Sequence, residues 1–220
     1  MSSWPEAERI FARAKDPSAP LVLDVVDDAG DRLATLRPLI ATDAGNDGLV
    51  RDIARWREAN KERFLTIFPL DVEATRQWIR RFPVEDPRRI LFLVQGANGE
   101  RYGHYGLLID GPGEIEIDNT LRGADRCPPR LFHHVARRII AWAIDEVGAT
   151  RLIVRVLSNN RQAIEHQRAN GFVLETILPL REVREGAMVR REVVADPSQS
   201  NLPFGLAVLS YPVPGDCATR

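Results

Sequence analysis

One stretch of the sequence is the most informative about the fold of this chain: Arg151-Leu-Ile-Val-Arg-Val-Leu-Ser-Asn-Asn-Arg-Gln-Ala-Ile-Glu-His-Gln-Arg-Ala-Asn-Gly-Phe172. Its apolar first residues predict a short strand, and Ser158, Asn159 and Asn160 predict a polar break. A helix of about ten residues follows. Asn160 can cap this helix through its side-chain oxygen, and Gly171 suits a left-handed helix stop. The segment therefore predicts a strand-helix-strand unit.

The remaining patterns predict an α/β fold, with a mixed and largely antiparallel central sheet flanked by helices in a single domain. Alternating or continuous apolar runs bounded by turn residues predict the further strands at 21–26, 32–39, 89–95, 102–110, 114–119, 172–183 and 188–195. Apolar residues at helical spacing predict helices near 49–64, 71–82 and 131–147. Ser3 and Glu6, with Pro5 between them, predict a capped helix near 5–15. Asp71 is the expected cap of the third helix, and Pro83 is expected to end it.

Composition limits the classes of partner. The chain has 220 residues, 44% of them hydrophobic and 28% charged, with a formal net charge of −1. These values are typical of a soluble globular protein and predict no general attraction to nucleic acid or membranes. The N-terminus has no signal-peptide pattern, so we expect a cytoplasmic protein. Cys127 and Cys217 match no zinc or redox spacing, and reduced thiols are favoured over a disulfide.

The pattern Asn160-x-x-Ala163-Ile164, followed by Gly171 and Phe172, resembles the closing motif of the GNAT superfamily of acyl-CoA-dependent N-acyltransferases. The order of the predicted elements is also that of GNAT folds. The resemblance implies a GNAT-like domain over residues 32–195. Residues 1–31 are then an N-terminal extension with a helix and a strand, and 196–220 a C-terminal tail whose apolar run Leu206-Ala-Val-Leu209 is expected to dock on the body.

Further segments are similar to a bacterial GNAT subgroup from surface-polysaccharide gene clusters, whose enzymes acylate amino sugars that are commonly nucleotide-linked. They are Arg55-Trp-Arg57, Arg89-Ile-Leu-Phe-Leu-Val94, Gly103-His-Tyr-Gly-Leu107 and Ile115-Glu-Ile-Asp-Asn-Thr-Leu-Arg-Gly123. In this subgroup Trp56 is a candidate platform for stacking a sugar. A core tryptophan is the favoured alternative.

The resemblance makes residues 114–119 the central strand beside the reacting centre. Alternation places Glu114, Glu116 and Asp118 on one face, and Ile115, Ile117 and Asn119 on the other. Three carboxylates buried without partners are costly, so at least one is expected to face a cleft. Glu116 and Asp118 are the candidate general bases, because a carboxylate can take the proton that an ammonium must lose. The alternatives are a solvated face or ion pairs with Arg122 and Arg155.

Other proton-transfer groups are less clear from the sequence. His104 is a third catalytic candidate on the preceding strand, and its neighbour Tyr105 must point to the opposite face. In GNAT proteins a tyrosine often stands seven residues after the motif asparagine as general acid. Here that position holds Gln167, so the role is unfilled, performed by water or moved. His166 is expected to be a surface residue.

The resemblance also implies the acetyl-CoA contacts. Backbone N–H groups of Asn119, Thr120 and Leu121 are candidates for polarising the thioester carbonyl, and Asn160 lies beside the acyl-carrier arm. The best match to the phosphate loop is Arg126-Cys-Pro-Pro-Arg-Leu131. Proline has no N–H to donate, so Pro129 is expected in the first helical turn, or Arg126 and Arg130 hold phosphate with their side chains. A loop that binds no CoA is the alternative.

These observations predict an N-acetyltransferase that moves an acetyl group from acetyl-CoA to a primary amine on a nucleotide-linked amino sugar, by direct attack in a ternary complex. Acetyl-CoA and a small amine are the expected partners, without metal, and open strand edges are compatible with a homodimer. An aminoglycoside-like compound and a protein amine are the alternative acceptors. A GNAT-fold domain that binds a ligand or partner without transfer is the rival, supported by the proline-bearing loop and Gln167.

Overall fold

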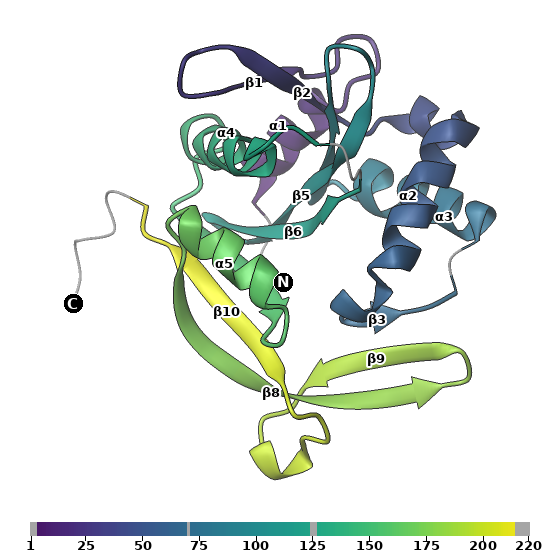
Figure 1. The fold of residues 1–220 in the computed structure, drawn as a ribbon, viewed down its shortest axis with the longest axis vertical. Helices are drawn as coiled ribbons and strands as arrows, with labels where there is room; N and C mark the ends of the chain where they lie inside the picture. The colour runs from purple at the N-terminus through teal and green to yellow at the C-terminus, as the bar shows by residue number, and fades with distance from the viewer. Residues whose placement is uncertain (1–3, 70, 124–126, 214–220) are drawn as a thin grey trace.

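Ten strands form one sheet in the computed structural model, which describes residues 4–69, 71–123 and 127–213 (Figure 1). Their order across the sheet is β1-β2-β4-β5-β6-β7-β10-β8-β9-β3. The strands are β1 (Leu23–Val26), β2 (Arg32–Pro38), β3 (Thr66–Ile67), β4 (Arg89–Gln95), β5 (Arg101–Gly111), β6 (Glu114–Arg122), β7 (Arg151–Leu157), β8 (Val173–Glu185), β9 (Met188–Val193) and β10 (Gly205–Tyr211). Among these described strands only β6 and β7 pair in parallel.

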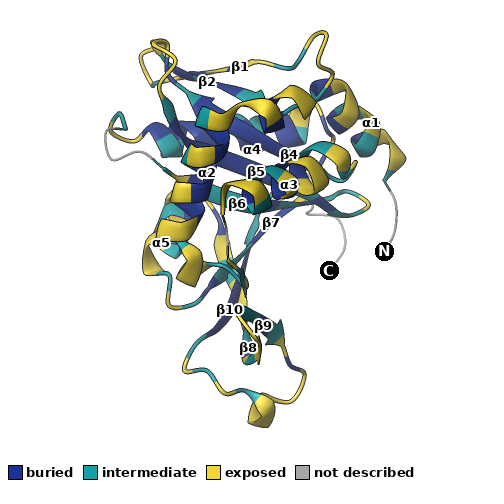
Figure 2. Cartoon of the chain, turned by 90° about the vertical axis from the view of Figure 1, so that its right-hand side faces the viewer, coloured by how far each residue is buried: buried dark blue, intermediate teal, exposed yellow. Residues whose placement is uncertain are grey.

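Five α-helices of the described residues cover the sheet: α1 (Pro5–Ala14), α2 (Asp47–Ala59), α3 (Val72–Ile79), α4 (Leu131–Asp145) and α5 (Arg161–Ala169). The larger core packs α1 and α4 on one face, where Phe11 stacks on Trp142 at 5.8 Å between ring centroids. The smaller core packs α2 and α3 on the other face. Figure 2 shows these buried residues gathered in the body, while the β8–β9 hairpin projects from it.

The parallel pair β6–β7 separates partway along its length. The register pairs Glu114 with Arg151 and continues only to Ile117 with Val154. Beyond that point β6 runs on beside β5 to Arg122, whereas β7 runs on beside β10 to Leu157. The facing edges of the two strands therefore have no strand partner past Ile117, and the sheet opens as a wedge.

A β-bulge lies on β6 just beyond the start of this wedge. Gly106 pairs with Asp118 and His104 with Leu121, so two residues of β6 face Tyr105 alone. Asn119 has a φ of 48°, a left-handed conformation that asparagine tolerates better than most residues. The expected alternation therefore fails at Asn119, whose side chain lies on the same face as the Asp118 carboxylate and bonds to it.

The predicted strands and helices are confirmed in type and order, and the strand at 89–95 is confirmed residue for residue. Asn160 caps α5 and Asp71 caps α3, as the sequence predicts. Pro83 does not end the third helix directly, because the chain continues through a π-helical turn at Arg80–Glu85. The apolar run 206–209 docks as part of β10, inserted between β7 and β8.

The N-terminal helix is tied to the body by Lys15. Its ammonium group donates hydrogen bonds to four backbone carbonyl oxygens, those of Pro83, Val84, Asp86 and Arg89, at 2.9–3.2 Å. This contact fixes the π-helical turn and the start of β4 against α1. None of the helices in the described part of the chain combines the length and apolar character that a membrane crossing requires.

Candidate active site

A cavity of about 700 Å³ occupies the wedge between β6 and β7. Its wall includes Glu116 to Arg122 of β6 and Val154 to Leu157 of β7. Residues of α5 line one end, and residues of α2, α3 and the segment 60–68 line the other. Because α5 packs against the α1–α4 core and α2 and α3 form the opposite core, the cavity is walled from both faces of the sheet.

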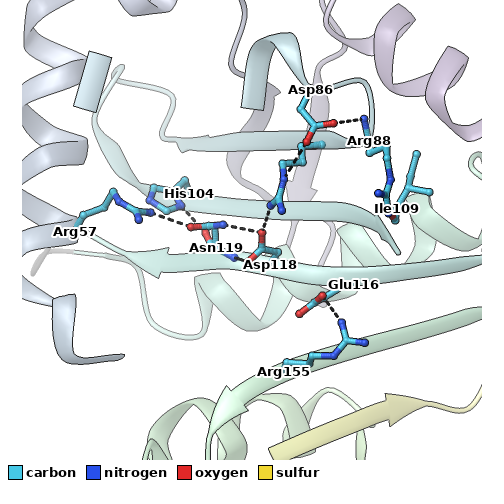
Figure 3. A network of polar contacts seen from close by, with 10 residues as sticks. Arg57, Asp86, Arg88, His104, Ile109, Glu116, Asp118, Asn119 and Arg155 are labelled. Atoms are coloured by element: carbon cyan, nitrogen blue, oxygen red, sulfur yellow. Dashed lines mark hydrogen bonds and ion pairs between the residues drawn. The ribbon is translucent and has the colours of Figure 1, made fainter. Parts of the chain in front are cut away.

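Glu116 stands where β6 and β7 begin to diverge, one residue before the last parallel pair. Its side chain is only 13% exposed. Burial raises the pKa of Glu116 to about 7, although the charge of Arg155 lowers it. Arg155 pairs with Glu116 at 2.5 Å (Figure 3). It also pairs with Asp110 at 2.8 Å. A carboxylate whose pKa lies near neutrality can exchange a proton with a substrate in the cavity.

Asp118 also lines the cavity, but its oxygens are already engaged. Oδ1 accepts the backbone N–H of Asn119 at 2.7 Å, and Oδ2 accepts the Asn119 side-chain amide at 2.7 Å. Arg89 pairs with Oδ2 as well and also contacts Asp86. Figure 3 labels both carboxylates, Asp118 and Asp86. Asp118 therefore holds the bulge and Arg89 in place, and Glu116 is the carboxylate better placed to act as base.

Arg57 of α2 reaches into the cavity wall from the opposite side. Its Nη1 donates to Asn119 Oδ1 at 2.9 Å, so the bulge is held from both ends of the Asn119 side chain. The guanidinium lies over the rings of Phe64 and Trp78, with Cζ 4.5 Å and 4.2 Å from their centroids. Trp56, the neighbouring residue, is absent from the wall and packs on His104 and the Gly123 backbone.

His104 lies beneath the bulge and outside the cavity lining. It is fully buried, and its Nδ1 is 2.6 Å from the carbonyl oxygen of Asn119. A carbonyl oxygen only accepts, so Nδ1 carries the proton. Burial first, and then the charge of Arg57, lower the pKa of His104 to about 3. His104 therefore does not line the cavity with Glu116. It supports the bulge through its hydrogen bond to the Asn119 carbonyl.

Three buried oxygens meet beside the bulge on the α5 side: Tyr105 OH, Thr120 Oγ1 and Gln167 Oε1. The Tyr105 hydroxyl lies close enough to interact with the Gln167 and Thr120 side chains. Burial raises the pKa of Tyr105, and the nearby Gln167 and Thr120 side chains partly oppose this rise. Thr120 and Gln167 line the cavity. The cavity wall therefore carries polar atoms beside the bulge that a polar ligand can contact.

The predicted phosphate loop is described in part. Arg126 lies outside the described residues. The helix α4 begins at Leu131, so Pro129 stands in the turn before it and not in its first turn. Arg130 caps the helix with a φ of 58°, and its side chain is 3.7 Å from Asp28. Leu131 is buried, and neither it nor Arg130 lines the cavity.

The structure thus brings together six of the residues predicted from the sequence: Glu116, Asp118, Asn119, Thr120, Leu121 and Asn160. His104, Arg130 and Leu131 lie outside this group. The ion pair of Glu116 with Arg155, one of the alternatives stated from the sequence, is present. The sequence did not indicate Arg57, Arg89 or the aromatic pair Phe64 and Trp78 as site residues. The Arg55-Trp-Arg57 pattern includes Arg57, but only Trp56 was interpreted as a candidate ligand contact. His166, expected at the surface, lines the cavity, and burial lowers its pKa.

Comparison with solved structures supports the fold. A probable GNAT-family acetyltransferase from Chromobacterium violaceum superposes with a TM-score of 0.61 at 20% identity, over 82% of this chain and 83% of that one. A GCN5-related N-acetyltransferase from Brucella melitensis gives 0.62 at 19% identity, over 82% and 76%. Spermidine N-acetyltransferase from Vibrio cholerae, in complex with CoA and spermine, gives 0.58 at 14% identity, over 81% and 94%.

The sequence itself matches a family model. No curated protein sequence matches the chain. The model of the acetyltransferase (GNAT) domain matches residues 34–173, which run from within β2 through α5 and include every wall residue of β6 and β7. With the diverging parallel strands and the cavity between them, this match identifies the chain as a member of the GNAT acetyltransferase family.

Proposed function

We propose that this protein transfers an acetyl group from acetyl-CoA to a primary amine, on a nucleotide-linked amino sugar, by direct attack in a ternary complex. The wedge-shaped cavity with Glu116 at its closed end carries the proposal. Bound acetyl-CoA supplies the activated acyl group as a thioester. The residues Asn119, Thr120, Leu121 and Asn160 line the part of the wedge that this arm would enter.

Glu116 acts as the general base in this proposal. The acceptor nitrogen must lose a proton before it attacks the acyl carbon, and the Glu116 carboxylate takes that proton. A carbon–nitrogen bond then forms while the carbon–sulfur bond breaks, and the thiolate leaves as CoA. The backbone of the bulge, fixed by Asp118, Arg57 and His104, holds the free edge of β6 where charge develops on the acyl oxygen.

The test is acetyl transfer with a panel of amines, followed through the free thiol of released CoA. Amino-sugar nucleotides are expected to give turnover that depends on both substrates and shows sequential kinetics. Turnover with an aminoglycoside or a protein N-terminus in their place would reassign the acceptor. Ping-pong kinetics would refute direct attack, because they indicate a covalent acyl-enzyme.

A further inference from the structure

Arg57 is a buried cation of the cavity wall that forms no ion pair with a carboxylate of the described residues. The residue is 4% exposed. A guanidinium has five N–H donors, yet Arg57 has one hydrogen bond, to the neutral amide oxygen of Asn119. Its Nε–H is buried and has no partner among the described residues. The side chain therefore keeps unused donors in a site that a ligand can enter.

The surroundings of Arg57 hold the cation without neutralising it. Burial lowers the pKa of Arg57 to about 10, and the charge of Asp118 only partly offsets this. The rings of Phe64 and Trp78 stabilise the guanidinium through their faces and restrict its rotation. A buried charge with only aromatic and amide neighbours is costly unless a counter-charge completes the site.

The two half-buried arginines of the wall have carboxylate partners already, whereas Arg63 and Arg122 are exposed. Arg155 is paired with Asp110 and Glu116, and Arg89 with Asp86 and Asp118. The contrast singles out Arg57 as a buried cation that remains available to a ligand. It belongs to α2, on the face of the sheet opposite the α1–α4 core against which α5 packs.

We propose that Arg57 binds an oxyanion of the acceptor, a carboxylate or a phosphate, in a bidentate contact between Phe64 and Trp78. This inference rests on the proposed transferase function and narrows its substrate class. Arg57 bonds Asn119, and the Cα atoms of Asn119 and Glu116 are at most about 10 Å apart along the strand. One small molecule can therefore place an amine at Glu116 and an oxyanion at Arg57.

The same geometry disfavours polycationic acceptors. Spermidine or spermine would bring positive charge toward an unbalanced buried guanidinium, and like charges repel strongly where water is excluded. The chain therefore differs in expected acceptor from the spermidine N-acetyltransferase whose fold it shares. A molecule with both an amine and an oxyanion, such as a sugar phosphate or an amino acid, fits both ends of the cavity.

Matched pairs of amines test the proposal. The pairs are a hexosamine 1-phosphate with its free hexosamine, and an α-amino acid with its amide, with spermidine as the polycation. The wild type is expected to favour the anionic member of at least one pair in kcat/KM by about 10- to 100-fold. The pair that shows the preference separates phosphate from carboxylate recognition.

Variants of Arg57 then test whether this residue causes the preference for the anionic amine. Arg57→Gln is expected to bring the two members of the pair to similar kcat/KM, and Arg57→Lys to keep part of the preference because it keeps the charge. Arg55→Gln, on the exposed face of the same helix, is the matched control and should change neither value. Equal use of both members by the wild type, better use of spermidine, or a preference that survives Arg57→Gln would overturn the proposal.

A binding measurement separates this proposal from the transferase function. The ¹H–¹⁵N resonance of Arg57 Nε, assigned by its loss in Arg57→Gln, is followed with saturating CoA while inorganic phosphate or acetate is added. A shift with either anion supports the oxyanion site even if no amine in the panel is acetylated. No shift with both anions refutes it, even if transfer is observed.

Discussion

Replacing Glu116 by glutamine keeps the shape of the side chain and removes the carboxylate proposed to accept the proton of the amine. The pKa of Glu116 is about 7, since burial disfavours its charged form. Its ionised fraction is therefore roughly 0.1 at pH 6 and 0.9 at pH 8, which makes the Glu116 contribution to kcat/KM rise about tenfold over that range. Loss of a general base costs about 10²- to 10⁴-fold.

The assay is steady-state release of CoA thiol at pH 6 and pH 8 for the wild type and Glu116→Gln. The amine of the acceptor titrates equally in both proteins, so the ratio of their kcat/KM values isolates Glu116. This ratio is expected to be about tenfold larger at pH 8 than at pH 6. Glu114→Gln is the matched control, because Glu114 lies on the same strand face, pairs with Arg151 and does not line the cavity.

A ratio that stays constant with pH would exclude Glu116 as the general base, because a purely structural effect of the residue does not depend on its ionisation. Activity of Glu116→Gln within threefold of the wild type at pH 8 would equally remove Glu116 as the base; this threshold lies well below the roughly hundredfold minimum expected for general-base catalysis.

Three further changes test the electrostatics and packing around the site. Arg155→Gln removes the charge that lowers the pKa of Glu116, so the midpoint of the kcat/KM profile should move about 1–3 pH units alkaline; an unmoved midpoint would contradict the pairing. His104 stays neutral in the folded protein down to about pH 3 while the unfolded chain takes a proton below pH 6.5, so its contribution to stability is full above pH 6.5 and falls with pH. The wild type should lose about 2 kcal/mol more unfolding free energy than His104→Gln between pH 8 and pH 5, by urea titration, and parallel losses would contradict this. Lys15→Met removes a donor from four carbonyl oxygens, of which Asp86 O keeps the backbone N–H of Arg89, and should lower the unfolding free energy by about 2–3 kcal/mol at an unchanged urea m-value. A change below about 0.5 kcal/mol would show the contact to be dispensable.

Much of the fold is predictable because its signals are local. Apolar runs and turn glycines fix the strands near 89–95 and 102–110, and Gly99 has the positive φ, 79°, that its hairpin turn requires. The helix cap at Asn160 is also local, because the Asn160 side chain accepts a hydrogen bond from the backbone N–H of Ala163, three residues later. By contrast, the position of β10 between β7 and β8 depends on pairing between distant segments. The sequence pattern of residues 205–211 does not indicate which strands they pair with.

The site was predictable only in outline. Alternation identified the carboxylates of β6, but it cannot anticipate the left-handed conformation of Asn119, which arises from bonds to Asp118, Arg57 and His104. Those partners come from other elements or from the bulge itself. Arg57 and Trp56 are adjacent and both buried, yet only Arg57 lines the cavity, since neighbours on a helix point about 100° apart. Which of the two faces a ligand is set by packing against α3 and β5.

We propose that the opening between β6 and β7 receives acetyl-CoA, and calorimetric titration with acetyl-CoA measures this binding. The wild type is expected to bind, and acetyl-CoA at 100 times Kd should stabilise the fold by about 2.7 kcal/mol. Ala163→Trp places a large ring in the cavity wall and should abolish binding, whereas Ala169→Trp, at an exposed position of the same helix, should not. No binding by the wild type at millimolar acetyl-CoA, or equal binding by a folded Ala163→Trp protein, would contradict the account.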